Sequence, residues 1–282
     1  MQALTVMTWN VRYFSQPLRG ARSTDGALRR AAAAVVGSGL LPDVLALQEV
    51  EDTSLRGGLG GVRQLDRFRG ALHHALHNAG HERRYRSLYF PVHRYEARGA
   101  PPLYTTGLAF LVREDLPVEG VGQQEVTHVR LPAFSRLKQR RIVCWATIGG
   151  VTVFNTHLSL PAFFEGGPHT VPARMGAASN QREEVGRLLS GIGDRAGVLV
   201  GDFNCRKGSA ALQRLHDAGW DNACPEVPGD ATASFMRWRM HIDHVFVRGL
   251  ACTARRGFGI DEDSPFRGLS DHSPKWVAIR PA

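Results

Sequence analysis

Two adjacent apolar runs limit the kind of sheet that this chain can form. Residues 141–148 and 151–158 are both rich in apolar and β-branched side chains, and only Gly149-Gly150 lies between them. Two glycines readily adopt the positive φ angles of a two-residue hairpin, so the segment predicts a pair of antiparallel strands. A purely parallel sheet needs long crossover connections instead. The sequence therefore favours antiparallel or mixed sheets over a doubly wound parallel sheet.

Other segments predict helices between further strands. Residues 181–192 carry apolar side chains at i, i+3, i+4 and i+7, which is typical of a helix with one buried face. We expect other helices at 24–36, 60–80 and 209–218, and other strands at 4–11, 43–50, 85–91, 107–112, 198–200, 242–247 and 275–279. The pattern fits an α/β (α+β) fold in which two mixed sheets pack together with helices outside. Because no repeat or linker interrupts it, we expect one domain over residues 1–282.

Several function classes are excluded by composition. The longest apolar runs fall short of the roughly 20 residues that a membrane span needs, so we expect no integral membrane protein. The N-terminal residues read as a strand rather than a signal peptide. The four cysteines, Cys144, Cys205, Cys224 and Cys252, form no CxxC pair and are interpreted as reduced thiols. These features predict a cytoplasmic protein, which we expect to be a monomer; a mature secreted form whose signal has been removed is the alternative.

The net charge admits two interpretations. The 282 residues include 35 Lys and Arg against 26 Asp and Glu, which gives a formal charge of +9. A basic surface attracts nucleic acid or anionic membranes. An arginine-rich genome would produce the same excess without any functional meaning. The choice between them therefore depends on the motifs.

Polar side chains recur just where apolar strands are expected to end. Burying an unpaired carboxylate costs several kcal/mol, so repeated acidic groups at such positions suggest that they converge at one edge of the sheets. Carboxylate oxygens suit Mg²⁺, and the chain lacks the HExxH, GxxxxGK[ST] and GxSxG motifs of other hydrolases. The residues concerned are Asn10, Gln48, Glu49, Asn155, His157, Asp202, Asn204, Asp243, Asp271 and His272.

Six short segments that contain these residues occur in an order typical of one known superfamily. They are Thr8-Trp9-Asn10-Val11, Leu47-Gln48-Glu49-Val50, Asn155-Thr156-His157-Leu158, Gly201-Asp202-Phe203-Asn204, Ile242-Asp243-His244-Val245-Phe246 and Ser270-Asp271-His272-Ser273-Pro274. The chain thereby resembles the endonuclease/exonuclease/phosphatase superfamily over nearly its whole length. It lacks the Tyr-x-Pro-Asn-Gly segment of abasic-site endonucleases, so it is more similar to the deoxyribonuclease I-like and tyrosyl-DNA phosphodiesterase 2-like branch.

The resemblance implies a four-layered αββα sandwich with a metal-dependent site at one edge. It implies that Glu49 is the principal ligand of Mg²⁺, for which Mn²⁺ could substitute. Asn10 and Asp271 would lie close to the metal or its waters.

The resemblance also implies the catalytic roles. Asp202 would align or deprotonate the attacking water, and Asn204 would contact the phosphate or that water. His272, with its tautomer fixed by Asp243, would contact the phosphoryl oxygen or act as the base. His157 would stabilise charge near the phosphate. The choice of base between Asp202 and His272 stays open.

Three local features are candidates for substrate binding. Arg140 and Arg141 end a basic stripe, 136–141, that could hold a phosphate backbone or could merely protect a sheet edge with charge. Phe164 could form an aromatic lip for base stacking or could pack against the core. Trp238 precedes the strand of Asp243, where family members often place a substrate-facing aromatic residue.

The leading hypothesis is a Mg²⁺-dependent phosphodiesterase, a nuclease or DNA-end-processing enzyme, with nucleic acid as its partner and DNA favoured. One alternative is a phosphodiesterase or phosphatase for a lipid headgroup or small phosphate ester. A more remote one is a non-catalytic nucleic-acid-binding module. Asn155 could have a structural rather than a catalytic role. We expect His73, His74, His77, His81 and His216 to be surface or packing residues, and residues 261–263 to form a solvated loop.

Overall fold

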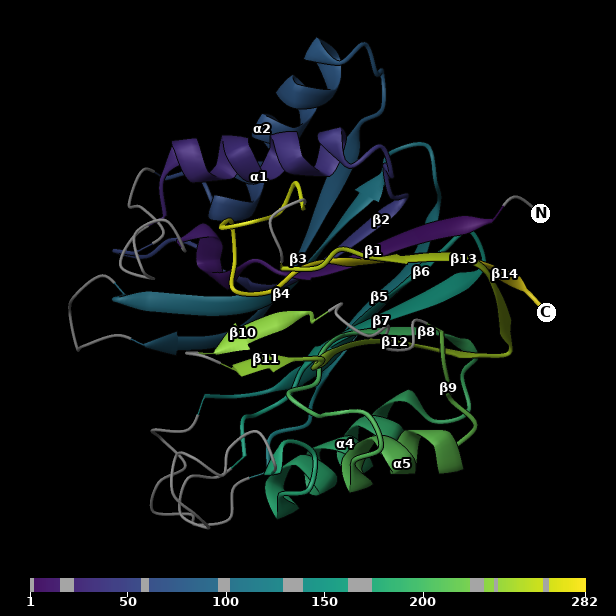
Figure 1. The fold of residues 1–282 in the computed structure, drawn as a ribbon. Helices are drawn as coiled ribbons and strands as arrows, with labels where there is room; N and C mark the ends of the chain where they lie inside the picture. The colour runs from purple at the N-terminus through teal and green to yellow at the C-terminus, as the bar shows by residue number, and fades with distance from the viewer. Residues whose placement is uncertain are drawn as a thin grey trace.

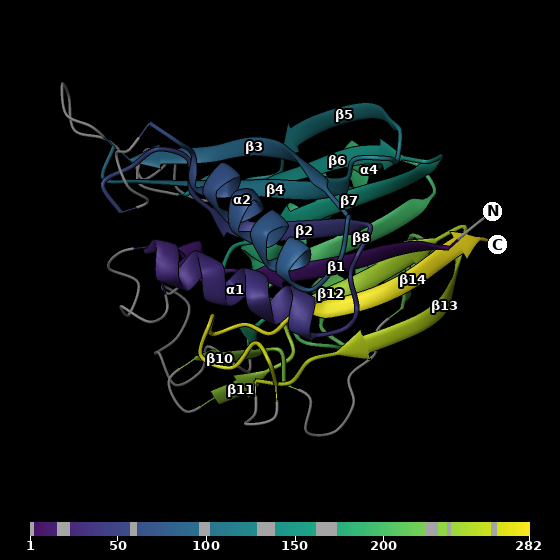
Figure 2. The ribbon, with the colours of Figure 1, turned by 90° about the horizontal axis from the view of Figure 1, so that it is seen from above.

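Two six-stranded sheets pack face to face, and a pair of helices covers the outer side of each (Figure 1). The computed structural model describes residues 3–15, 23–56, 61–95, 102–128, 139–161, 174–223, 231–235, 238–260 and 264–282. Seen from above, the helices α1 and α2 run across the first sheet (Figure 2). No helix within these ranges combines the length and the apolar character needed to cross a membrane.

The first sheet has the strand order β13-β14-β1-β2-β4-β3. Its strands are β1 (Leu4–Asn10), β2 (Val44–Val50), β3 (Tyr85–Tyr95), β4 (Tyr104–Arg113), β13 (Leu250–Gly257) and β14 (Lys275–Pro281). Helices α1 (Asp25–Gly37) and α2 (Gln64–Asn78) lie on its outer face. Helix α1 begins where the sequence predicts, because the Thr24 hydroxyl accepts a hydrogen bond from the Ala27 amide as an N-cap.

The second sheet has the order β5-β6-β7-β8-β12-β9. Its strands are β5 (Val118–Glu125), β6 (Ile142–Ile148), β7 (Val151–His157), β8 (Gly197–Asp202), β12 (Asp243–Arg248) and β9 (Asp221–Asn222), and α4 (Ser179–Ile192) and α5 (Ala210–Asp217) cover it. A short hairpin, β10 (Ala233–Phe235) and β11 (Trp238–Met240), and a short helical turn, η1 (Arg12–Phe14), complete the described elements.

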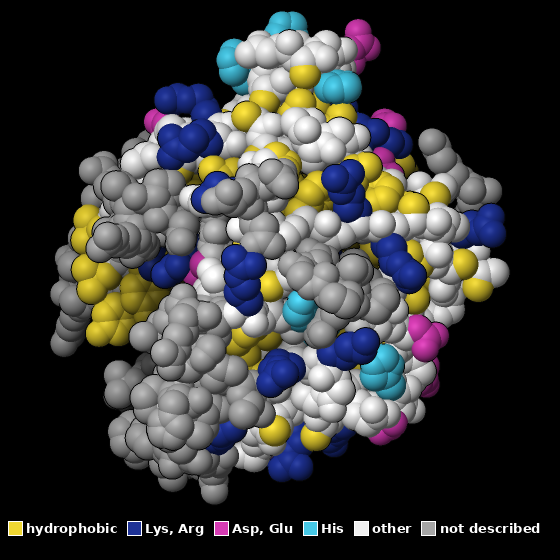
Figure 3. Space-filling model, viewed as in Figure 1, with side chains coloured by type: hydrophobic (Ala, Val, Ile, Leu, Met, Phe, Trp, Pro, Cys, Tyr) yellow, Lys and Arg dark blue, Asp and Glu magenta, His cyan; other side chains and the backbone are white. Residues whose placement is uncertain are grey.

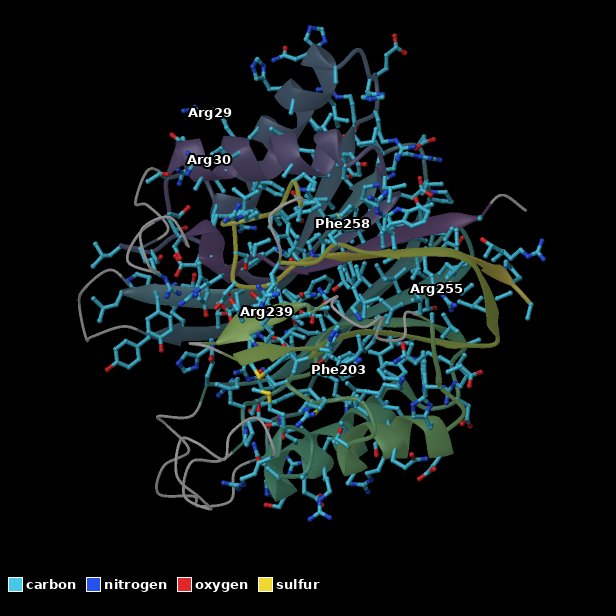
Figure 4. All side chains as sticks on the ribbon, viewed as in Figure 1. Arg29, Arg30, Phe203, Arg239, Arg255 and Phe258 are labelled. Carbon is cyan, nitrogen blue, oxygen red and sulfur yellow. The ribbon has the colours of Figure 1, made fainter. Side chains whose placement is uncertain are left out.

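Three apolar layers hold this sandwich together. The central layer lies between the sheets and includes Val6 and Phe110 from the first and Val153 and Val200 from the second. The two outer layers pack each sheet against its helices. Figure 4 shows Phe258 on the side of α1 and Phe203 on the side of α4 and α5. The predicted four-layered αββα architecture is confirmed.

The predicted hairpin is also confirmed. Strands β6 and β7 pair antiparallel, and Gly149 and Gly150 both have positive φ, 55° and 80°. Both sheets are mixed, because β1 pairs with β2 and β7 with β8 in parallel. Cys144 and Cys205 are buried free thiols, whereas Cys224 lies outside the described residues.

The sequence misses strands and one helix boundary. Strands β5 and β13 were not expected, because most of their side chains are exposed or only half-buried and therefore show no buried alternation. The helix expected over 60–80 begins only at Gln64, and Val62 is 52% exposed instead of facing the core.

Two buried amides connect the sheets close to the site described below. The Gln48 Nε2 atom on β2 donates to Asn155 Oδ1 on β7 at 2.7 Å. The Asn155 Nδ2 atom donates in return to the backbone oxygens of Leu47, at 3.0 Å, and Ala109, at 3.3 Å. Both side chains are completely buried. Asn155 therefore has the structural role that the sequence left open.

We predict that Asn155→Leu lowers the free energy of unfolding by about 3 kcal/mol, because it leaves several buried polar groups without partners. Urea unfolding followed by circular dichroism measures this. The control is Gln213→Ala, which removes an exposed amide that bonds Asp217 on α5 and should cost less than about 0.5 kcal/mol. Equal losses from the two variants would contradict the structural role of Asn155.

Candidate functional site

Five strands bring their polar ends to one edge of the sandwich. In the parallel pair β1–β2, Asn10 lies opposite Gln48, and in the parallel pair β7–β8, His157 lies opposite Asp202. Asp243 opens β12 and pairs antiparallel with Asp202. Because parallel strands end at the same edge, the register sets these groups side by side within each sheet, and the packing of the two sheets brings the two sets together. The convergence that the sequence predicts is therefore present.

Glu49 reaches this edge through a local irregularity of β2. The register of the β2–β4 pair shifts between Leu47 and Val50, and Glu49 has a φ of 55°. Such a bulge turns a side chain away from the regular alternation of the strand. A non-glycine residue with positive φ costs roughly 1–3 kcal/mol, and residues of this kind concentrate at functional sites.

Asn10 links the two carboxylates of the site. Its Nδ2 atom donates to Asp202 Oδ2 at 3.0 Å and to Glu49 Oε1 at 3.4 Å. Burial raises the pKa of Glu49, and burial raises the pKa of Asp202 to about 7. These shifts arise because little water reaches the two negative groups.

His272 forms an ion pair with Asp243 and faces Asp202. Its Nδ1 atom donates to Asp243 Oδ2 at 2.9 Å, and its Nε2 atom lies 3.7 Å from Asp202 Oδ2. Burial lowers the pKa of His272, but the charges of Asp243 and Asp202 outweigh burial and raise that pKa well above its ordinary value. The geometry therefore favours an imidazolium that has an acidic group at each nitrogen.

His157 has the opposite electrostatic character. Its Nε2 atom lies 3.5 Å from Asp202 Oδ2 and 3.9 Å from Glu49 Oε1. Burial, together with the positive charges of Arg141 and His272, lowers the pKa of His157 well below its ordinary value. The site thus holds one neutral and one charged imidazole close to the same oxygen of Asp202.

Asn204 lies in a tight turn directly after Asp202. Its backbone N–H donates to Asp202 Oδ1 at 2.9 Å, and its Nδ2 atom donates to the Leu158 oxygen at 2.9 Å. Gln181 on α4 donates to the Asn204 backbone oxygen at 2.6 Å. These bonds hold a left-handed backbone, with φ of 49° at Asn204. The role of its side chain toward substrate stays a prediction.

Asp271 and the basic residues lie around this centre. Asp271 Oδ2 accepts from Arg12 Nη1 at 2.6 Å and lies close enough to raise the pKa of Glu49, although burial is the larger cause. Arg141 is largely buried and acts electrostatically on Glu49 and His157, whereas Arg140 is exposed. Phe164 and the Trp238 side chain lie outside the described residues, as do Arg136, Lys138 and residues 261–263.

Two residues that the sequence did not single out also border the site. Tyr13 has a left-handed backbone, with φ of 55°, and burial and the nearby Glu49 raise its pKa to about 12. The guanidinium of Arg56 lies 3.6 Å from the centre of the Tyr13 ring. Three consecutive non-glycine residues, Arg12 to Phe14, have positive φ. Local sequence gives no signal for such a turn.

The donor atoms fit a hard divalent cation. Among the described residues, oxygen or nitrogen donors of Asp202, Asp243 and His272 lie within 4.8 Å of one another. The Nδ1 atom of His272 is engaged by Asp243, and Asn10 Oδ1 accepts from the Arg12 backbone N–H at 3.0 Å, so the carboxylates of Glu49 and Asp202 are better placed as ligands. Burial raises the pKa of both Glu49 and Asp202, and a cation bound between them would stabilise their charged forms.

Comparisons with known proteins agree with this architecture. Residues 7–272 match the family described as Endonuclease/Exonuclease/phosphatase family. No curated protein matches the sequence.

Three solved structures illustrate the similarity. An endonuclease/exonuclease/phosphatase from Beutenbergia cavernae is 21% identical, with a TM-score of 0.66 over 100% of this chain and 72% of its own. The catalytic domain of human nocturnin, solved with sulfate, is 16% identical, with a TM-score of 0.63 over 100% and 94%. A mannosyl-6-phosphatase from Bacteroides thetaiotaomicron is 18% identical, with a TM-score of 0.64 over 98% and 99%. At these identities the likeness shows the fold alone.

We predict that Asp243→Asn lowers the pKa of His272, because the variant removes the largest of the negative charges that raise it. A raised folded-state pKa stabilises the protein fully below the ordinary value of about 6.5, and this stabilisation is lost as pH rises through the folded value. The free energy of unfolding of the variant should therefore be about 3 kcal/mol lower than that of the unaltered protein at low pH, with a smaller difference at high pH.

Histidine titration by NMR, with urea unfolding across pH, tests this prediction. His73, whose pKa is lowered mainly by burial on α2, serves as the control and should not change. An unchanged His272 pKa in the variant would show that Asp243 does not hold the imidazolium.

We predict that divalent cations bind more tightly as pH rises through the acidic range, because the carboxylates of Glu49 and Asp202 attract a cation only when charged and burial raises the pKa of both. Affinity should rise by about tenfold per pH unit for each proton that is released when a cation binds. Titration calorimetry with MgCl₂ or MnCl₂ measures it. In Asp202→Asn this pH dependence should weaken, and a pH-independent affinity in the unaltered protein would contradict the assignment.

Proposed function

Because this chain belongs to the endonuclease/exonuclease/phosphatase family, whose members hydrolyse phosphate esters, we propose that it is a Mg²⁺-dependent phosphodiesterase that acts on nucleic acid, with DNA as the favoured substrate. The observation that carries this proposal is the position of Asp202. It contacts Asn10, lies 3.5 Å from His157 and 3.7 Å from His272, and opposes Asp243 across the β8–β12 pair.

A bound Mg²⁺ would neutralise a phosphoryl oxygen and stabilise the leaving oxygen. Glu49 would hold it, and Asn10 and Asp271 would contribute close to the ion or through the waters around it. The ion pair of Asp271 with Arg12 fixes that carboxylate close to Glu49. Mn²⁺ would serve in the same position.

The protein groups divide the remaining chemistry. Asp202, which contacts Asn10 and lies close to both imidazoles, would align the attacking water and accept its proton. His272 is held as an imidazolium by Asp243 and would donate a hydrogen bond to a phosphoryl oxygen as negative charge develops there. This division favours Asp202 over His272 as the base. Asn204 would orient the water or phosphate, and His157 would stabilise charge near the phosphate.

The charge of the surface supports a polyanionic substrate. The chain carries a net charge of +9. Figure 3 shows Lys and Arg spread over one face, and Figure 4 labels Arg29, Arg30, Arg239 and Arg255 there, all of which are exposed. Arg141 beside His157, with Arg140 outside it, would contact phosphates that flank the scissile one.

A second candidate is hydrolysis of a small phosphate ester by the same groups. The structural likeness to a mannosyl-6-phosphatase favours it. A substrate panel separates the two candidates, because a phosphomonoesterase releases inorganic phosphate and leaves an internal phosphodiester intact.

We predict that the protein nicks plasmid DNA or degrades single-stranded DNA when Mg²⁺ or Mn²⁺ is present, and that EDTA abolishes this activity. Glu49→Gln and His272→Ala should each lower kcat by about 100-fold or more, since each removes a group that acts in the reaction. The control is Asp115→Asn, an exposed member of an ion pair with Arg113, which should keep full activity.

The panel contains supercoiled plasmid, single-stranded DNA, RNA, sphingomyelin and hexose 6-phosphates. Release of inorganic phosphate without cleavage of any nucleic acid would contradict the nuclease proposal in favour of the second candidate. Release of choline phosphate without such cleavage would favour a phosphodiesterase that acts on a lipid headgroup. Tight DNA binding without metal-dependent cleavage would indicate a binding module instead.

A further inference from the structure

Two tyrosines form an aromatic ledge at the outer end of the β3–β4 hairpin. The rings of Tyr95 and Tyr104 stack with centroids 5.4 Å apart and an angle of 11° between their planes. Tyr95 is 45% exposed and the neighbouring Leu103 is 47% exposed. Figure 3 shows hydrophobic side chains gathered at this end of the hairpin. We call Tyr95 and Tyr104 the tyrosine ledge.

The hairpin projects past the strand that carries Glu49. The pairing of β2 with β4 ends at Val50 and Gly107, whereas β3 and β4 stay paired as far as Tyr95 and Tyr104. The ledge therefore extends beyond the edge where the polar groups meet, on the side of Glu49. It is placed to contact a part of the substrate that lies outside the reacting phosphate.

A continuous stack connects the ledge to the site. The Arg56 guanidinium lies 5.0 Å from the centre of the Tyr104 ring and 3.6 Å from the centre of the Tyr13 ring. Tyr13 in turn lies close enough to Glu49 to sense its charge. Arg56 is fixed by the buried Glu51, whose Oε1 accepts from Arg56 Nε at 2.5 Å. The tyrosine ledge, the Arg56 guanidinium and the Tyr13 ring therefore form a series of contacts that begins at the protein surface and ends near Glu49.

Positive charge lies along the same path. Arg140 and Arg141 both act electrostatically on His93, whose ring lies 6.3 Å from that of Tyr104. The ledge thus joins an exposed aromatic surface to cations that suit an anionic chain. A nucleotide complements such a surface, because each base presents a flat π face that can stack on an aromatic ring and each linkage carries a negative charge.

We propose that the tyrosine ledge binds one unpaired nucleobase of the substrate by stacking against Tyr95, while a phosphate of the same chain occupies the site at Glu49 and Asp202. This proposal rests on the proposed function and narrows its substrate class to nucleotides with an accessible base face, such as single strands or frayed ends. A base inside an intact duplex has both faces stacked on its neighbours, so it could not stack on Tyr95.

The test compares two single-stranded oligonucleotides, one of thymidines and one in which tetrahydrofuran abasic residues replace the thymidines. Tyr95→Ala should raise KM for the thymidine chain by about tenfold, as expected for loss of one stacked base, and should leave KM for the abasic chain and kcat for both unchanged. The matched variant Tyr95→Phe keeps the ring and should behave like the unaltered protein. Because Tyr95 is largely exposed, thermal unfolding should show that all three proteins are folded.

Binding separates this proposal from the proposed function. Fluorescence anisotropy with Glu49→Gln as background measures affinity for both oligonucleotides without turnover. A loss of affinity caused by Tyr95→Ala for the thymidine chain alone would support the ledge even if no hydrolysis were found. Equal effects on the two chains, or no effect on either, would overturn it. Reduced binding to phosphatidylcholine vesicles, with oligonucleotide affinity unchanged, would overturn it in favour of a lipid contact.

Discussion

The burial of Asp202 between two imidazoles is the constraint on which the rest of the site depends. Only 2% of this residue is exposed, so its charge cannot be stabilised by water. It is satisfied instead by Asn10, by the backbone N–H of Asn204 and by the nearby His272. Each of these groups comes from a different segment. Burial of the carboxylate raises its pKa, because little water reaches its charged form.

Holding so many polar groups together requires both sheets to keep a fixed relative position. Asn10 and Glu49 belong to the first sheet, whereas Asp202 belongs to the second. The amide pair of Gln48 and Asn155 connects the two sheets one residue from Glu49. Positive φ angles at Glu49 and in the turn after β1 then direct side chains into the space between the strand ends. The packing of the apolar layers on both sides stabilises the fold and offsets this local backbone strain.

Much of the fold could be predicted because apolar periodicity reports burial. The β6–β7 hairpin, the capped helix α1 and the helix α4 all follow from local patterns. Strands β5 and β13 could not be found, because they lie at sheet edges and bury few side chains. Among the residues that border the site, Tyr13 and Arg56 could not be predicted. The position of Tyr13 depends on a left-handed turn, and that of Arg56 depends on contacts with Tyr13 and with Tyr104 of a distant hairpin.

The sequence by itself determined the alternation of strands and helices, the family and the polar residues that end the strands, because apolar spacing and short motifs are local properties. Only the tertiary structure decided which charge state each polar group favours. His157 ends β7 and His272 lies just before β14, yet burial beside Arg141 keeps the first imidazole neutral while Asp243 and Asp202 hold the second in its charged form. Such differences arise from neighbours distant in the chain, and only folding brings those neighbours within a few ångströms.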